Sequence, residues 1–126
     1  MKQLILFLVL AAPVHAAPPA SFWKALHQVE TSGRLGAIEG DGGRSLGPLQ
    51  ISRAYFTDSR VAGSYEQVVD LPFARRVVSA YLQRYAPKAW AAGDVETLAR
   101  IHNGGPRGDR KQATINYAAK VRRAMR

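Results

Sequence analysis

Apolar residues recur at intervals of three and four along most of the chain, which predicts a mainly helical protein. The first stripe is expected to form a helix that Ser21 caps and that runs to about Glu30. A longer stripe follows Asp70, which can cap a helix whose first turn contains Pro72. The apolar positions of the five predicted helices are Phe22, Ala25, Leu26 and Val29; Leu49, Ile51, Ala54 and Tyr55; Phe73, Val77, Val78, Tyr81, Leu82 and Tyr85; Val95, Leu98, Ala99 and Ile101; and Ile115, Ala118, Ala119 and Val121.

Glycine and proline mark where these helices are expected to end. Gly63-Ser64 follows the second helix, Ala86-Pro87 the third, and Gly104-Gly105-Pro106 the fourth, which Asp94 is expected to cap. In the last helix the basic side chains are expected to point outward, opposite the apolar face.

Between the first two helices lies a glycine-rich segment, residues 33–47, without a helical pattern. Residues 35–38 are a weak strand candidate, and the glycines around them suit tight turns. We therefore predict a mainly α protein of the α+β kind: a single helical domain with a small glycine-rich β-hairpin lobe.

Residues 1–16 have the pattern of a secretory signal peptide. Lys2 precedes an apolar run at residues 4–12, and Val14-His15-Ala16 ends in small residues that suit cleavage. The run is too short to cross a bilayer, so no stable membrane insertion is expected. These features predict export to the periplasm or out of the cell, and a folded domain formed by residues 17–126.

The charge balance indicates an anionic partner. The 126 residues include 18 lysines and arginines against nine acidic residues, a formal net charge of +9. Nucleic acids, anionic lipids and cell-wall polymers share the required chemistry, but export and the lack of a base-reading motif disfavour nucleic acid. The absence of cysteine excludes thiol catalysis, and three histidines are too few for a histidine-rich metal site. We therefore expect no metal and no cofactor.

Two acidic residues near the front of the chain are candidates for paired acid–base chemistry. Glu30 ends the first predicted helix, where the negative end of the helix dipole favours the protonated carboxyl group that a general acid needs. Asp41 lies in a glycine-rich turn, where backbone N–H groups can stabilise an ionised carboxylate, and Glu39 competes for that role. Such a pair fits glycoside hydrolysis. On position alone, a solvated Glu30 and a turn-forming Asp41 are the simpler interpretations.

Two further segments combine glycine with polar side chains. In residues 47–51 a Gly-Pro turn leads to Gln50, whose amide can orient neighbouring backbone or a bound sugar. His102 and Asn103 precede Gly104-Gly105-Pro106, where glycine allows a ligand to approach the backbone closely. Taken singly, an ordinary helix end capped by Asn103, with His102 packed against the core, is the simpler interpretation.

Taken together, these segments resemble the invertebrate-type (destabilase-type) lysozyme family over about residues 22–117. Tyr55-Phe56-Thr57-Asp58 also fits the family's aromatic pair followed by an aspartate. The stretches that carry the resemblance are Val29-Glu30-Thr31-Ser32-Gly33; Asp41 with residues 45–51; residues 81–85; and residues 99–108, which are the most specific.

The resemblance implies a lysozyme-like fold for residues 17–126 and hydrolysis, with retained configuration, of the β-1,4 bond between N-acetylmuramic acid and N-acetylglucosamine in peptidoglycan. By the same resemblance Glu30 matches the general acid and Asp41 the second catalytic carboxylate. Peptidoglycan is the implied partner, and a proteinaceous lysozyme inhibitor is a further one. The positions matched to those that line or support the cleft are Gln50, Tyr55, His102 and Asn103.

The chain departs from the family pattern at several points. It has no cysteine, whereas the family is usually rich in disulfides, and a cysteine-free member is expected to be bacterial. Thr31 is inserted after Glu30, and the stretch from Asp41 is one residue short, which leaves Glu39 open as the second carboxylate. Ser52 occupies the position of the lysine proposed for isopeptide cleavage in some members, so that second activity is not expected.

Two other functions fit parts of the sequence. A lytic transglycosylase would use Glu30 alone and release an anhydro sugar without water, but its glutamate is normally followed directly by serine, where this chain has Thr31. A non-catalytic protein would bind the cell wall through the basic residues 100–126. Analysis of the released sugar separates the first alternative from a lysozyme, and substitution of Glu30 separates the second.

Overall fold

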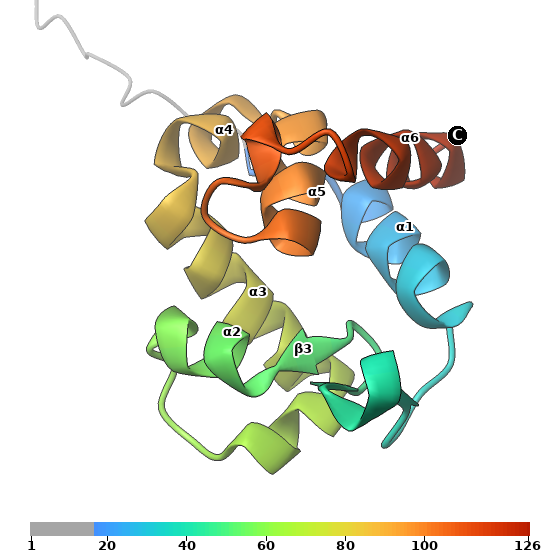
Figure 1. The fold of residues 1–126 in the computed structure, drawn as a ribbon, viewed down its shortest axis with the longest axis vertical. Coiled ribbons are helices and arrows are strands. Elements are labelled where there is room, and N and C mark those ends of the chain that lie inside the picture. Colours follow the sequence, from blue (N-terminus) through green and yellow to red (C-terminus); the bar gives the residue numbers. More distant parts are fainter. Residues whose placement is uncertain (1–16) are drawn as a thin grey trace, which may run out of the picture.

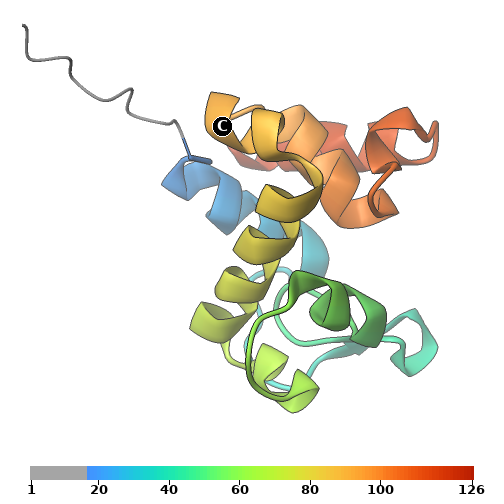
Figure 2. The same ribbon diagram turned by 90° about the vertical axis from the view of Figure 1, so that its left-hand side faces the viewer.

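The computed structural model describes residues 17–126, which form a helical body and a small β lobe (Figures 1 and 2). The expected signal peptide, residues 1–16, lies outside the described residues. Within residues 17–126, no helix is both long and apolar enough to cross a membrane. The helices are α1 (Ala20–Thr31), α2 (Arg53–Ser59), α3 (Leu71–Tyr85), α4 (Pro87–Ala92), α5 (Val95–Gly104) and α6 (Thr114–Ala124), with 3-10 helices η1 (Asp41–Gly43), η2 (Tyr65–Val69) and η3 (Gly108–Arg110).

The core of the body lies where α1, α3, α5 and α6 pack together. α3 runs through the middle of the molecule and joins the body to the part that contains α2 and the lobe (Figure 2). The chain has no cysteine and therefore no disulfide, so the domain depends on the burial of apolar side chains. Each large apolar side chain contributes about 1.5–3 kcal/mol to the free energy of unfolding. Most of the first four predicted stripes and half of the last are confirmed as buried, namely Phe22, Ala25 and Leu26; Leu49, Ile51 and Tyr55; Phe73, Val77, Val78, Tyr81 and Leu82; Leu98, Ala99 and Ile101; and Ala118 and Val121.

Two of the predicted helix caps are confirmed and one is wrong. Asp70 and Asp94 each accept a hydrogen bond from the backbone N–H three residues further on, at 3.0 and 3.2 Å, and so cap α3 and α5. Ser21 does not cap α1, which begins at Ala20 after Pro19 and has no side-chain cap. The fixed φ of Pro19 suits the start of a helix without one.

The β lobe contains a three-stranded antiparallel sheet in the order β1-β2-β3. The predicted hairpin lobe is confirmed, but the strand expected at residues 35–38 is wrong. Gly36 turns the backbone with a φ of +99°, so pairing begins only at Glu39, which lies opposite Leu46. The strands are β1 (Glu39–Gly40), β2 (Ser45–Leu46) and β3 (Ile51–Ser52).

The helix expected after Pro48 begins later than predicted, at Arg53. Gln50 has a left-handed φ of +53°, which stops a helix from forming there, and the next two residues pair as β3. Ser52 then caps α2 by accepting a hydrogen bond from the backbone N–H of Tyr55 at 3.1 Å.

Two features of the later helices differ from the predicted pattern. Pro87 ends α3 as expected, but it also opens α4, a short helix that was not predicted, because proline suits the first helical position. On α6 the buried face includes Thr114, whereas Ile115, expected to point inward, is 39% exposed. The Thr114 hydroxyl donates to the Gly108 carbonyl at 2.6 Å, so a polar side chain with an internal partner takes the buried position.

The end of α1 is joined to the β lobe through Thr31, the apparent insertion after Glu30. Its side chain is buried, and its hydroxyl donates to the Pro48 carbonyl at 2.9 Å. His27, one turn earlier, contacts the Arg34 carbonyl through Nε2 at 2.7 Å. These contacts set the position of the lobe relative to the last turn of α1, which carries Glu30.

We expect Thr31→Val to lower the free energy of unfolding by about 1–3 kcal/mol, because valine keeps the shape but leaves the buried Pro48 carbonyl without its donor. Chemical denaturation measures the change. Thr57→Val, at an exposed position on α2, is the matched control and should change stability by less than about 0.5 kcal/mol. Equal effects of the two substitutions would contradict the proposed tie between α1 and the lobe.

Candidate active site

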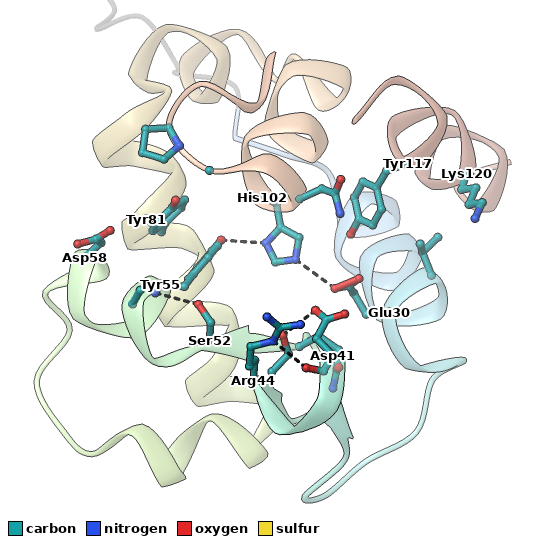
Figure 3. A pocket seen from close by; sticks show the side chains of 17 residues that line it. Glu30, Asp41, Arg44, Ser52, Tyr55, Asp58, Tyr81, His102, Tyr117 and Lys120 are labelled. Atoms are coloured by element: carbon teal, nitrogen blue, oxygen red, sulfur yellow. Dashed lines mark hydrogen bonds and ion pairs between the residues drawn. The ribbon is translucent and has the colours of Figure 1, made fainter. Parts of the chain in front are cut away.

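A cleft of about 920 Å³ lies between the helical body and the β lobe (Figure 3). Glu39, the alternative second carboxylate, does not line it but lies in an adjoining hollow that shares Arg44, Ser52 and Ala54 with the cleft. All six residues named from the sequence line this one cleft, namely Glu30, Asp41, Gln50, Tyr55, His102 and Asn103.

Glu30 lies in the last turn of α1, and its side chain is only 16% exposed. Oε2 lies 3.6 Å from Nε2 of His102, an ion pair when the imidazole is protonated but too long for a good hydrogen bond. Tyr117 of α6 also faces this part of the cleft (Figure 3). The carboxyl group is therefore enclosed by α1, α5 and α6. It is not the solvated group that its sequence position at a helix end suggests.

His102 is buried in the core, as expected for its helix, but it also takes part in a polar chain that reaches the cleft. Its Nδ1 lies 2.8 Å from the hydroxyl of Tyr55. Burial, followed by the nearby Tyr81, raises the pKa of Tyr55 well above its ordinary value, so this hydroxyl stays neutral. When Tyr55 donates to Nδ1, the remaining N–H of His102 is on Nε2 and faces Glu30.

Tyr55 is fixed in place by aromatic stacking. Its ring lies 3.7 Å from that of Tyr81 at an angle of 12°, and the His102 ring meets it edge-on at 5.4 Å. Burial raises the pKa of Tyr81 to about 12. Tyr55, Tyr81 and His102 therefore form a packed aromatic cluster that lines the cleft and connects α2, α3 and α5.

Asp41 faces Glu30 from the lobe side of the cleft (Figure 3). It has a left-handed φ of +51°, a conformation that aspartate adopts more readily than most residues. Ser45 donates to Oδ2 at 3.2 Å, and Arg44 donates to the Asp41 backbone carbonyl at 3.0 Å. The hydrogen bond to the carboxylate thus comes from a serine side chain and not, as expected, from the backbone of the turn.

Gln50 braces the lobe. Both hydrogen bonds of its amide nitrogen go to backbone carbonyls, those of Ile38 and Gly47, each at 2.9 Å. A side chain at Gly40 would collide with the amide oxygen of Gln50, which explains the glycine there. The sequence left two roles open for Gln50, orientation of the neighbouring backbone or of a bound sugar, and these bonds support the first. By holding the backbone of the lobe, Gln50 helps to position Asp41.

Asn103 has an exposed side chain on the last turn of α5, directly beside the buried His102. It is not the helix cap, because α5 continues to Gly104 and Gly105 is the C-cap. Gly104 packs against Thr114 of α6, so only Gly105 brings its backbone to the cleft. Asn103 therefore presents a donor and an acceptor to whatever occupies the cleft.

The cleft also contains charged and aromatic residues that the sequence analysis did not assign to it. Asp58 lies at one end and Lys120 at the other (Figure 3). Tyr81 was interpreted as part of an apolar stripe, and Tyr117 has no sequence signal beyond its place next to the buried Ala118. Among residues 17–126, no group of three or more potential metal ligands is found.

A helical body, a three-stranded lobe and an intervening cleft with an acidic side chain on each wall define the lysozyme-like class of α+β domains. The chain matches no family model. It is 40% identical over 79 residues to lysozyme 1 of Crassostrea virginica, covering 61% of this chain and 43% of that protein. It is 33% identical over 95 residues to invertebrate-type lysozyme 6 of Caenorhabditis elegans, covering 66% and 69%.

The fold is also found among solved structures. A crystal structure of Aeromonas hydrophila PliI in complex with Meretrix lusoria lysozyme matches with a TM-score of 0.72 and 30% identity, covering 86% of this chain and 91% of that one. The chain belongs to the invertebrate-type lysozyme family. It spans less than two thirds of the length of several curated relatives, including the Crassostrea virginica protein.

The buried tyrosines predict how the fold responds to alkali. Burial raises the pKa values of Tyr55, Tyr81 and Tyr117, whereas an unfolded tyrosine ionises near its ordinary value of about 10. Above about pH 10 the unfolded chain has lost protons that the folded protein still binds, so stability should fall as pH rises. We expect tyrosinate absorbance to develop late, and together with unfolding. Full ionisation near the ordinary value in a protein that stays folded would contradict this assignment.

Proposed function

We propose that this protein hydrolyses the β-1,4 bond between N-acetylmuramic acid and N-acetylglucosamine in peptidoglycan, with Glu30 as general acid and Asp41 as the second carboxylate. The observation that carries the proposal is the placement of these two side chains on facing walls of one cleft, with Glu39 outside it. Membership of a lysozyme family supports the choice of bond.

The reaction needs two opposed roles for the two carboxyl groups. Protonated Glu30 donates its proton to the glycosidic oxygen as that bond breaks, while the ionised Asp41 carboxylate attacks the anomeric carbon from the other face. Glu30 then removes a proton from water, whose oxygen displaces Asp41 and restores the original configuration. The partly buried position of Glu30 and the exposed, serine-bonded carboxylate of Asp41 fit these roles.

The Tyr55–His102 pair supports Glu30 from the side of the helical body. A neutral Tyr55 holds the imidazole in one orientation, and His102 Nε2 lies next to the carboxyl group that has to exchange a proton. The exposed side chain of Asn103 can bind the acetamido or hydroxyl groups of the substrate. The net charge of +9 raises the rate of encounter with an anionic wall.

The location and the partners of the protein follow from the same proposal. Peptidoglycan lies outside the cytoplasmic membrane, so the protein would meet it after export, which agrees with the signal pattern of residues 1–16. Meretrix lusoria lysozyme is bound to PliI in the crystal structure to which this chain is similar, and an inhibitor of that kind is a candidate partner here. Isopeptide cleavage is not proposed, because Ser52 lacks an amine and instead caps α2.

Glu30→Gln is expected to reduce wall hydrolysis by about 10²–10⁴-fold, because glutamine cannot donate a proton to the leaving oxygen. Clearance of isolated cell walls measures hydrolysis, and co-sedimentation measures binding, which should be unchanged. Undiminished clearance by the variant would show that Glu30 is not the acid. Binding without any clearance by the unmodified protein would support the non-catalytic alternative.

The second carboxylate is tested by a matched pair of substitutions. Asp41→Asn should lower the rate by about a hundredfold or more, since an electrostatic stabiliser of the transition state is lost. Glu39→Gln, two residues away in the adjoining hollow, should leave the rate close to normal. The opposite order would assign the role to Glu39. Mass spectrometry should find hydrated reducing ends, and 1,6-anhydro ends would instead indicate a transglycosylase that needs only Glu30.

A further inference from the structure

Tyr117 has a hydroxyl group without a hydrogen-bond partner in the interior, where polar groups normally have one. The oxygen is buried, and it makes no hydrogen bond within the described part of the chain. A buried hydroxyl that lacks a partner is costly, and native structures rarely keep one without a purpose. Tyr117 also lines the cleft, on the wall formed by α6 (Figure 3).

The neighbour to which this hydroxyl can donate is Glu30. Both side chains line the cleft, and the Tyr117 hydroxyl points toward the Glu30 carboxyl group (Figure 3). In agreement with this geometry, burial and then the nearby Glu30 carboxylate raise the pKa of Tyr117 well above its ordinary value. Solvent does not reach the hydroxyl oxygen, so a bound sugar could not reach it either unless side chains moved. The terminal torsion of a glutamate is soft, and a turn of the Glu30 carboxyl group brings an oxygen into line with the hydroxyl.

Glu30 itself needs such a donor once it is ionised. Its side chain is 16% exposed, and its contact with His102 Nε2, at 3.6 Å, is longer than a hydrogen bond. A partly buried carboxylate without hydrogen-bond donors is unfavourable, whereas its protonated form is much less so. The charged state arises in the reaction each time Glu30 gives its proton away.

We propose that Tyr117 is a positioning residue whose hydroxyl donates a hydrogen bond to the Glu30 carboxylate after Glu30 has given its proton to the leaving sugar. The inference rests on the proposed function for its place in the reaction, but the hydrogen bond itself does not depend on any substrate. Tyr117 remains neutral throughout, because its raised pKa keeps the proton on the phenol. The bond forms and breaks with the ionisation of Glu30, and no atom is transferred to Tyr117.

The charged and polar groups around Glu30 other than Tyr117 remain the same in the comparison that tests this bond. His102 faces Glu30 from α5, Tyr55 lies behind His102 on α2, and Lys120 follows Tyr117 on α6. Asp41 and Arg44 face the cleft from the lobe side. Because Tyr117→Phe removes one oxygen and no charge, a change in the titration of Glu30 reports the lost donor.

The test is Tyr117→Phe, with the ionisation of Glu30 followed by NMR of its isotope-labelled side-chain carboxyl carbon. Loss of a donor to the charged form should raise the ionisation midpoint by about one pH unit. The alkaline limb of the pH profile of kcat/KM should move by the same amount, and kcat should fall by about tenfold with little change in KM. Tyr85→Phe, at a tyrosine outside the cleft, is the matched control and should change none of these.

In the unmodified protein, the ζ-carbon signal of Tyr117 should also shift as Glu30 ionises, which tests the bond even if the variant folds poorly. An unchanged midpoint in Tyr117→Phe, or a Tyr117 signal that ignores the ionisation of Glu30, would overturn the proposal. Muramidase activity is measured separately on the unmodified protein and on Glu30→Gln. A failure of the proposed function therefore stays distinguishable from a failure of this inference.

Discussion

The site depends on where the last turn of α1 places one carboxyl group. Glu30 would be an ordinary solvated residue if α1 ended in open solvent, but α5 and α6 enclose it with His102 at 3.6 Å and with Tyr117. Enclosure brings the Glu30 carboxyl group to the wall of the cleft, next to His102 and Tyr117, where a group that donates a proton to a bound sugar has to lie. The packing of α1, α5 and α6 around this one carboxyl group is thus the physical basis of the proposed chemistry.

The opposite wall is held in place without a disulfide or a long sheet. Three two-residue strands cannot fix a lobe by themselves, since so short a sheet is marginally stable in water. The Thr31 hydroxyl on the Pro48 carbonyl and the Gln50 amide on two further carbonyls supply the missing constraints. Hydrogen bonds from side chains to the backbone therefore fix the lobe here, as disulfides fix loops in many exported domains. They hold Asp41 across the cleft from Glu30.

Sequence patterns predicted the helices, and the residues that meet in one cleft, better than they predicted the lobe. A regular apolar stripe such as that of α3 predicts a helix because its apolar residues repeat at the helical period within one short segment, so that one face of the helix is buried. The β lobe depends on left-handed residues such as Gln50 and on long-range pairs, which no short pattern encodes. Single positions remained ambiguous as well. From its position in the sequence, Glu30 was most simply interpreted as a surface residue, and only the packing of α5 and α6 beside it shows that it is partly buried. The sequence gives no indication of Tyr117, because its significance depends on a buried hydroxyl group without a hydrogen-bond partner, which only the structure shows.

The most direct test of the account compares the ionisation of Glu30 with the pH dependence of the reaction. The alkaline limb of kcat/KM on peptidoglycan fragments reports the essential acid of the free enzyme. If Glu30 is that acid, the midpoint of this limb coincides with the midpoint at which NMR sees the Glu30 carboxyl group ionise. A rate that stays high well above the Glu30 midpoint would contradict the central claim, because an ionised carboxylate has no proton to give.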